Sequence, residues 1–449
     1  MNILDKVRQP ENRKFELKKS LPPRAQWLKS IIAFANGAGG ELILGVDDKS
    51  RDIVGIENAF ELEEKISNTV HDSIRPSVSP YIQTINLKNR QLLSVQILPG
   101  QQKPYYLASK GLEEGAYIPI GSTNRQADLS AIEELKRQAY GISYLDQMFF
   151  HCDKDALDKD VLHVFFKRLL GVKKLLLNHL FHYVMLRKNN GDIFPTFLGV
   201  ILFGKENLPE LSEFDYSKIK ITRYKGIDRT EILSSQFFEL PLGLKIDSII
   251  DYTISEIPVT QKLVGAKRER ISVLPSFAVR EAVINAVVHR DYSLRGASVQ
   301  VDIFSDRCKI TSPGVLPGAL SIDLLGQGIS EIRNRSLARI FRGAGFMEEL
   351  GSGISRMIQE MKNSGNPRPE FEEKGQYFCV TLRTKHQMTF HLEEIYRTLR
   401  SKGPLSSSEI SKEIDIHQNT AIKRLKELID LGSVEKIGSG KNTKYKVKE

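Results

Sequence analysis

The sequence predicts a multidomain protein of the mixed α/β and α+β classes, and three observations lead to this expectation. The chain has 449 residues, more than the ~100–200 residues that one domain usually contains. Hydrophobic residues make up 41% and charged residues 27% of the chain, which is a globular composition and not a disordered one. The pattern of helices and strands changes twice, which divides the chain into domains at 1–142, 143–386 and 387–449.

Charge, cysteine content and hydropathy indicate which partners and compartment to expect. The formal net charge is +10, which fits a polyanionic partner. The three cysteines lie far apart and form no CxxC motif, so we expect neither a disulfide framework nor a structural zinc site. No apolar run approaches the ~20 residues that cross a bilayer, and the charged N-terminus contains no signal-peptide core. We therefore expect a cytoplasmic protein with no membrane partner.

The first region mixes short strands with helices. RKFELK at 13–18 predicts a strand, and a helix follows the Pro22-Pro23 turn and runs to Asn36. GGELILGVDD at 39–48 then predicts a buried strand that ends in a polar turn. Further strands are expected at 81–98 and 116–121, and a helix at 128–139.

The block AFANGAGGELILGVDD at 33–48 is the most informative part of this region. Together with FELKKS at 15–20 and AYIPIGSTN at 116–124, it resembles the Schlafen-type AlbA-like domain. The resemblance covers residues 11–140 and implies an α+β domain that binds nucleic acid.

The same resemblance implies a possible nuclease site. Schlafen-family ribonucleases carry two glutamates before a lysine, and an aspartate in the turn equivalent to GVDD. On this basis Glu11, Glu16 and Asp47 or Asp48 would be catalytic carboxylates that hold a divalent metal, and Lys18 would contact phosphate. Binding without cleavage stays open as the alternative, because Asp47-Asp48 is also an ordinary turn pair.

The second region is a larger α/β domain. Strands are expected at FLGVILFG (197–204), SKIKITRYKG (217–226), SVQVDIFS (298–305) and RCKITSPG (307–314). The helix FAVREAVINAVVHRDY places Glu281, Asn285 and His289 at i, i+4 and i+8, so they share one face. An amide oxygen that binds Mg²⁺ and a carboxylate that orients water suit nucleotide chemistry. The alternatives are a capping or salt-bridge role for Glu281 and Asn285, and a local polar network at His289-Arg290-Asp291.

Two glycine-rich turns follow this helix. The first runs from Gly314 to Gly318, and the second contains Gly351 and Gly353. The second turn opens a helix, whose N-terminal amides would attract phosphate.

This order of motifs resembles the N-box, G1 and G2 boxes of GHKL-type ATP-binding folds. EAVINAVVHRDY, the SPG turn, RNRSLARIF and MEELGSGISRM are also similar to proteins often labelled RecG-like, over residues 145–385. The resemblance implies an α/β sandwich that binds ATP with Mg²⁺: Asn285 would hold Mg²⁺ with the nucleotide, and Glu281 would be catalytic in an ATPase. The other residues implied around the nucleotide are His289, Gly314, Gly318, Gly351 and Gly353.

Two features limit what the resemblance implies. Ser312 stands where GHKL folds place an aspartate that hydrogen-bonds adenine, so the choice of base stays open. The chain contains no GxxxxGK[ST] phosphate loop, which argues against a helicase motor. Whether a bound nucleotide would be hydrolysed also stays open.

The third region predicts three helices and a terminal hairpin, from HLEEIYRTLRSKG, SSSEISKEID, IHQNTAIKRLKELIDLGSV and VEKIGSGKNTKYKVKE. This order resembles a winged helix-turn-helix, in which the N-terminal end of the third helix enters the major groove of DNA. That end would offer Gln418, Asn419 and Thr420 to bases. Phosphate contacts would come from Lys423 and Arg424 on the helix and from Lys441 and Lys444 in the wing. A winged helix that binds proteins is the alternative.

The whole pattern predicts a nucleic-acid-binding and ATP-binding regulator, with DNA favoured over RNA. Its middle domain would sense nucleotide and control transcription through the flanking domains. The alternatives are a metal-dependent endoribonuclease with a role in defence and a scaffold that binds only proteins. A homodimer also stays open, since winged helices that read palindromes usually dimerise, although no long dimerisation helix is visible.

Overall fold

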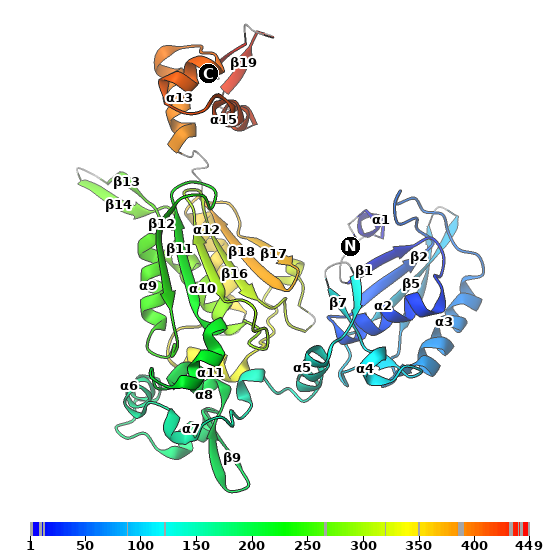
Figure 1. The fold of residues 1–449 in the computed structure, drawn as a ribbon. Helices are drawn as coiled ribbons and strands as arrows, with labels where there is room; N and C mark the ends of the chain where they lie inside the picture. Colours follow the sequence, from blue (N-terminus) through cyan, green and yellow to red (C-terminus); the bar gives the residue numbers. More distant parts are fainter. Residues whose placement is uncertain are drawn as a thin grey trace.

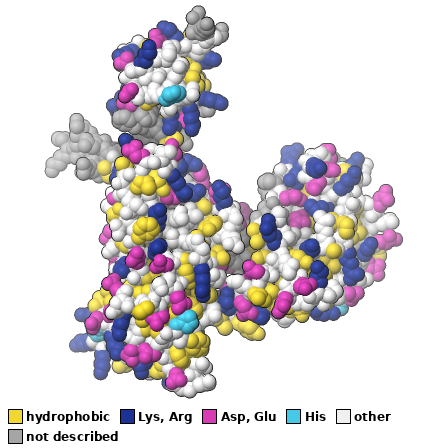
Figure 2. All heavy atoms as spheres, in the orientation of Figure 1, with side chains coloured by type: hydrophobic (Ala, Val, Ile, Leu, Met, Phe, Trp, Pro, Cys, Tyr) yellow, Lys and Arg dark blue, Asp and Glu magenta, His cyan; other side chains and the backbone are white. Residues whose placement is uncertain are grey.

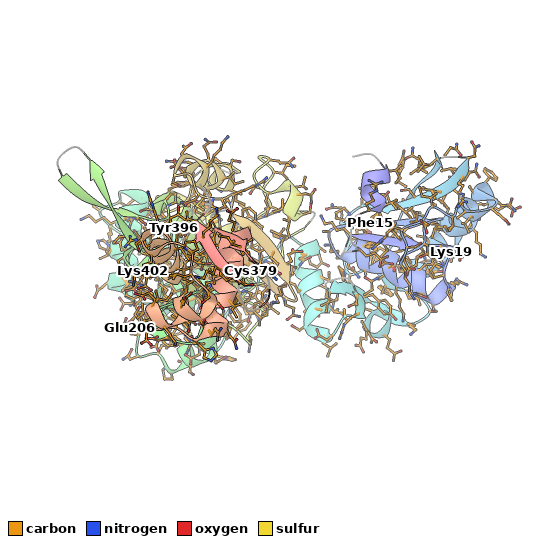
Figure 3. The ribbon with its side chains drawn as sticks, turned by 90° about the horizontal axis from the view of Figure 1, so that it is seen from above. Phe15, Lys19, Glu206, Cys379, Tyr396 and Lys402 are labelled. Carbon is orange, nitrogen blue, oxygen red and sulfur yellow. The ribbon has the colours of Figure 1, made fainter. Side chains whose placement is uncertain are left out.

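The structure is a computed structural model with three units along the chain (Figure 1). It describes residues 3–8, 11, 14–87, 89–120, 123–264, 267–318, 320–348, 351–384, 390–430, 434–438, 440 and 443–447. The N-terminal unit lies to one side of the larger middle unit, and the C-terminal unit lies beyond one end of the middle sheet. Figure 3, viewed from above, separates Phe15 and Lys19 of the N-terminal unit from Cys379 of the middle unit in the same way.

The N-terminal unit is built on a four-stranded sheet in the order β1-β2-β5-β4, in which only β1 and β2 are parallel. One buried cluster packs α2 against this sheet and includes Trp27, Ile31 and Phe34. Phe15 and Leu17 of β1 enter a second cluster on the opposite face. The elements are α1 (Ile3–Val7), β1 (Phe15–Lys18), α2 (Arg24–Asn36), β2 (Gly40–Leu44), α3 (Ala59–Ser73), β3 (Ile74–Arg75), β4 (Tyr81–Leu87), β5 (Arg90–Ile97), β6 (Tyr106–Leu107), α4 (Gly111–Gly115), β7 (Tyr117–Ile120), β8 (Thr123–Gln126) and α5 (Leu129–Ala139).

The middle unit begins with a mostly helical segment that packs under the main sheet. Its elements are η1 (Tyr144–Asp146), η2 (Lys154–Ala156), α6 (Lys159–Leu170), α7 (Leu177–His182), β9 (Leu186–Asn189), β10 (Asp192–Pro195), α8 (Phe197–Phe203) and η3 (Pro209–Ser217).

The strand predicted at 197–204 is wrong, because these residues form the helix α8. The side chain of Thr196 caps the helix by accepting a hydrogen bond from the backbone N–H of Gly199 at 3.0 Å. Every residue from Leu198 to Phe203 is buried, so the sequence carries no amphipathic period. A short, wholly apolar run cannot distinguish a buried helix from a buried strand.

The rest of the middle unit is a six-stranded sheet in the order β12-β11-β15-β16-β18-β17, with only β11 and β15 parallel. Its elements are β11 (Ile219–Tyr224), β12 (Ile232–Phe238), α9 (Ile246–Glu256), β13 (Val259–Val264), β14 (Lys267–Ser272), α10 (Ser276–Val288), β15 (Val299–Ile303), β16 (Arg307–Pro313), η4 (Ile322–Leu324), α11 (Arg335–Gly343), α12 (Ser352–Asn363), β17 (Glu370–Lys374) and β18 (Tyr377–Arg383). Helix α10 contacts β15, β16 and β18 of the sheet and has α9 and α12 as its helical neighbours. Its small apolar residues, such as Ala278 and Ala282, are fully buried, which brings the backbone of α10 close to the sheet.

The C-terminal unit contains three helices and a hairpin. Ser406 caps the second helix and forms a capping box with Glu409. Leu405 also forms an isolated antiparallel bridge with Tyr445, which ties the hairpin to the segment between the first two helices. The elements are α13 (Phe390–Lys402), α14 (Ser407–Glu413), α15 (Gln418–Asp430), β19 (Val434–Ile437) and β20 (Lys444–Val447).

The mixed α/β, multidomain class predicted from the sequence is confirmed. In the described part of the chain, no helix combines the length and the apolar composition needed to cross a membrane.

Candidate functional site

The acidic and amide residues predicted on α10 lie against the second glycine turn. Glu281 and Asn285 are one helical turn apart, and the Asn285 Nδ2 donates to Glu281 Oε1 at 2.9 Å. A Cβ added to Gly353 would lie 1.9 Å from the same Oε1 atom. The absence of a side chain at Gly353 therefore allows the Glu281 carboxyl to approach the first turn of α12.

The environment of Glu281 disfavours its charged form. The residue is only 8% exposed, and burial raises the pKa of its carboxyl, as does the nearby Glu348. The hydrogen bond from Asn285 and the charges of Arg280 and Arg356 act in the opposite direction and are outweighed. A carboxyl with a raised pKa beside a polar turn is characteristic of functional sites.

The turn before α12 has the backbone geometry that its glycines predict. Gly351 is the N-cap of α12 and has φ +89°, a left-handed conformation that glycine adopts without strain. A Cβ at this position would also meet the carbonyl oxygen of Gly328 at 2.8 Å. The turn thus presents the N-terminal amides of a 12-residue helix beside Glu281 and Asn285.

Arg290 and Asp291 form a polar network where α10 ends. Arg290 has 0% exposure and donates to the carbonyl oxygens of Tyr216 at 2.9 Å and Ala297 at 2.6 Å. Asp291 accepts from Arg333 at 2.6 Å. His289 follows the helix as its C-cap, and burial, with a smaller effect of Arg333, lowers its pKa to about 4.

The first glycine turn packs on this network. Gly314 has φ +107°, and a Cβ there would meet the Asp291 Cβ at 2.8 Å. Gly318 has φ +54° and is in contact with the carboxylate of Glu331. Ser312, by contrast, is buried and donates to the carbonyl oxygen of Ala286 on α10 at 2.7 Å. Its hydroxyl therefore links β16 to α10.

The N-terminal carboxylates are each engaged in separate local contacts. Glu16 accepts from Ser30 Oγ at 2.9 Å and from Asn124 Nδ2 at 2.7 Å, which occupies both of its oxygens. Glu11 accepts from the backbone N–H of Leu17 at 2.8 Å and lies 3.4 Å from Lys18 Nζ.

Asp47 forms a turn rather than a metal ligand set with the glutamates. Its Oδ1 accepts from the N–H groups of Ser50 and Lys49, and these two hydrogen bonds lower the pKa of the carboxyl. Asp48 is exposed beside it. Over the described ranges, no group of three or more His, Cys, Asp or Glu residues is placed to hold a metal ion.

The third helix of the C-terminal unit, α15, exposes most of the residues predicted to contact DNA. Its core face contains Ala421, Leu425 and Leu428. The exposed residues on or near it are Gln418, Asn419, Lys423 and the hairpin residue Lys444, and Thr420 is partly exposed. Lys441 lies outside the described residues.

Arg424 does not have the exposure that a phosphate contact requires, which corrects the prediction for this residue. It is 9% exposed and donates to Glu427 at 2.8 and 3.1 Å. The helical period places it beside the buried face, three residues after Ala421, where its charge needs an intramolecular partner.

Sequence reasoning missed Asn334, which organises the end of α10. Asn334 is 2% exposed and donates at 2.8 Å to the carbonyl oxygens of both Val288 and Arg290, while it accepts from Ser143 at 2.8 Å. It therefore joins the end of α10 to the segment that enters the middle unit. Asn334 belongs to the RNRSLARIF motif, which supports the family resemblance but does not by itself indicate a role for any one of its residues.

Two segments of the chain match known families. Residues 11–128 match the family described as "Schlafen, AlbA_2". Residues 296–382 match the family described as "Putative ATP-dependent DNA helicase recG C-terminal". The second match includes both glycine turns but begins after α10.

Individual proteins are similar to parts of the chain. "Uncharacterized ATP-binding protein UU034" of Ureaplasma parvum serovar 3 is 30% identical over 93 residues, which are 20% of this chain and 26% of that protein. The chain thus matches about a quarter of the length of this curated relative.

Two solved structures are also similar. The DIP2311 protein of Corynebacterium diphtheriae has 17% identity and a TM-score of 0.46, over 97% of this chain and 92% of that one. The N-terminal domain of a "Putative ATP-dependent DNA Helicase RecG-related Protein" of Nitrosomonas europaea has 26% identity and a TM-score of 0.22, over 28% and 92%.

The family matches agree with the two resemblances found in the sequence motifs. The chain therefore carries a Schlafen AlbA_2 domain in residues 11–128 and, in residues 296–382, a domain of the family described from the C-terminal part of RecG.

Proposed function

We propose that this chain is a nucleic-acid-binding and ATP-binding regulator whose middle unit senses the nucleotide. One observation carries the proposal: the Glu281–Asn285 pair of α10 lies directly on the glycine turn that opens α12. A carboxylate, an amide oxygen and a helix N-terminus together suit a Mg²⁺-chelated phosphate chain. The name of the Ureaplasma relative, an ATP-binding protein, supports the same ligand.

Each residue of this site has a role in the proposal. Asn285 is bonded to Glu281 through its amide nitrogen, which leaves its amide oxygen to hold Mg²⁺ with the nucleotide. The amides of the Gly351–Gly353 turn would face phosphate, and Gly314 and Gly318 shape the neighbouring turn. Bound Mg·ATP would supply a negative charge that these groups offset. If hydrolysis occurs, Glu281 would position the attacking water.

Two other units supply nucleic-acid contacts in this proposal. The C-terminal unit would act as a winged helix that reads DNA through Gln418, Asn419 and Thr420, with Lys423 and Lys444 on phosphates. The exposure of α15 on this side supports it. The AlbA_2 domain would add a second nucleic-acid surface that includes Lys18. DNA is favoured as the partner, and transcription regulation as the role.

A first experiment tests the nucleotide site. Equilibrium binding of labelled ATP with Mg²⁺ is measured for the wild type, for Asn285→Ala and for Asn68→Ala. Asn68 is an exposed residue of α3 in the N-terminal unit, so it controls for the loss of an asparagine. We expect saturable binding that is lost only in Asn285→Ala, and equal binding by all three proteins would contradict the assignment.

A second experiment tests the coupling. Affinity for duplex DNA is measured with and without Mg·ATP, in the wild type and in Asn285→Ala. We expect Mg·ATP to change the affinity of the wild type alone. The same affinity in both conditions would refute a sensor role and leave ATP binding and DNA binding as separate properties.

The geometry gives the ribonuclease alternative less support. Both oxygens of Glu16 are in hydrogen bonds, and Asp47 is used within its own turn. Degradation of structured RNA that Glu16→Ala abolishes would nevertheless establish that activity and displace the regulator as the main function.

A further inference from the structure

A cavity of about 1530 Å³ lies between the N-terminal and middle units. It lies in the region of the notch that separates the two units in Figure 2. Its walls come from α5, from loops of the AlbA_2 domain, from the Gly314–Gly318 turn and from the start of α11. Neither Glu281 nor Asn285 lines it, but the Gly314–Gly318 turn does, so the cavity borders the nucleotide site proposed above without including its acidic and amide residues. Ligand sites occur preferentially at such domain junctions.

In the described part of the chain, ion pairs join three of the seven acidic residues of the cavity wall to cations of the chain. Asp291 pairs with Arg333 at 2.6 Å, and Glu134 with Arg137 at 2.8 Å. Glu11 Oε1 lies 3.4 Å from Lys18 Nζ. Backbone N–H groups donate at 2.8 Å to Glu11, Asp128 and Glu373. Glu331 packs on Gly318. A backbone hydrogen bond leaves a carboxylate charged, so Asp128 and Glu372 both keep a negative charge that no described ion pair compensates.

Three cations of the wall are not paired in this way. Arg125 and Arg335 are exposed, and within the described contacts their guanidinium groups have neither an ion pair nor a hydrogen bond. Lys103 donates only to neutral oxygens, the Gly37 carbonyl at 3.2 Å and Gln138 Oε1 at 3.3 Å. Arg125 and Lys103 belong to the N-terminal unit and Arg335 to the middle unit, so positive charge faces the cavity from both sides.

The same wall carries apolar side chains that water now contacts. Leu98 is 68% exposed, Ile142 46% and Ile322 38%, and all three line the cavity. Apolar surface beside unpaired cations suits a ligand that combines an anionic group with an organic part.

We propose that this cavity binds a phosphate-bearing small molecule, with Arg125 and Lys103 on one side and Arg335 on the other. Arginine favours phosphate because its planar guanidinium can donate two parallel hydrogen bonds. A ligand held by both units would fix their relative position. The phosphate could belong to an inorganic ion or to a nucleotide, and the experiment separates these two sources.

The test uses full-length protein in an Asn285→Ala background, which removes the nucleotide site of the proposed function. Binding of pyrophosphate and of ATP is measured by titration calorimetry. Arg125→Gln and Arg335→Gln are compared with Arg368→Gln, an exposed arginine of the middle unit outside the cavity. We expect each cavity variant to weaken pyrophosphate binding roughly ten-fold or more, and Arg368→Gln to leave it unchanged.

The remaining outcomes identify the ligand or overturn the proposal. If ATP binds more tightly than pyrophosphate, the ligand is a nucleotide. If the two affinities are equal, the cavity recognises only the phosphate groups. The absence of binding, or equal binding by all variants, would refute the site. Binding of a single-stranded oligonucleotide is measured as well. If the cavity variants weaken only oligonucleotide binding and leave pyrophosphate binding unchanged, the proposal is also refuted, and the cavity lies on a nucleic-acid path. Arg125→Lys and thermal melting show whether a loss of binding reflects misfolding.

Discussion

Glu281 and Gly353 are in direct contact, although 71 residues separate them in sequence: a Cβ on Gly353 would lie 1.9 Å from the Glu281 Oε1. This contact joins the helix that carries the acidic and amide residues to the turn that opens α12. It makes Gly353 a sensitive position in the candidate nucleotide site, because any side chain there must displace the carboxyl.

We expect Gly353→Ala to weaken Mg·ATP binding roughly ten-fold or more, since its methyl group pushes Glu281 away from the turn at a cost of about 1–3 kcal/mol. Equilibrium ATP binding measures the effect. Gly296→Ala is the control, because a Cβ there would meet nothing within 4 Å. Unaltered ATP binding by Gly353→Ala would mean that the Glu281 contact has no part in the site.

The raised pKa of Glu281 predicts how stability changes with pH. Because the folded state binds this proton more tightly than the unfolded state, the wild type loses the associated stability as pH rises above the ordinary value of 4.5. Glu281→Gln removes this loss, so its stability relative to the wild type should increase from pH 4.5 toward neutrality. Chemical denaturation at several pH values measures the difference, and a constant difference would contradict the raised pKa.

Lys103 gives a pH dependence in the alkaline range. Burial lowers its pKa to about 8, although the charges of Glu331 and Glu134 oppose the shift. Between pH 8 and 10.5 the unfolded state binds more protons, so the wild type should gain stability with pH relative to Lys103→Met. Denaturation at pH 7.5, 9 and 10 tests this. Parallel curves for the two proteins would show that the amine is not buried in solution.

Arg290 should be essential for stability rather than for binding. Arg290→Met leaves the carbonyl oxygens of Tyr216 and Ala297 without their donors, which should cost about 3 kcal/mol. A fall in the melting temperature of the middle unit measures it. Arg368→Met, at an exposed position, should leave the melting temperature almost unchanged.

Lys423 and Arg424 are neighbours in sequence but should respond differently to substitution. Lys423→Ala should weaken DNA binding for all sequences and reduce the slope of log affinity against log salt by about 1. Arg424→Ala should mainly lower the stability of the C-terminal unit, because Arg424 is buried and bonded to Glu427. Salt titrations of DNA binding and thermal melting separate the effects, and a salt-slope change in Arg424→Ala would contradict its structural role.

Much of the fold was predictable because short-range sequence patterns specify its helices and turns. The i, i+4 spacing of Glu281 and Asn285 and the glycine turn that opens α12 both act within one or two helical turns. The motif order also predicted both family matches. Such features depend on neighbours in sequence, so they are readable without the tertiary structure.

Other features were decided only by tertiary packing. The apolar run at 197–204 is compatible with a strand or a helix, and its burial on all sides leaves no period that would distinguish the two; it forms the helix α8. Glu16 pairs with Asn124, 108 residues away, which no local pattern indicates. The burial of the Arg424 side chain depends on which face of α15 packs against the core.

The sequence by itself thus determined the three-part organisation, the helix that carries Glu281 and Asn285, and the two glycine turns. The tertiary structure decided which of these groups meet, that Ser312 faces α10, and that unpaired cations from two units line one cavity. The physical reason is range: hydrogen-bonded helices and turns are specified by adjacent residues, whereas contacts and charge pairing between elements arise only when the chain packs.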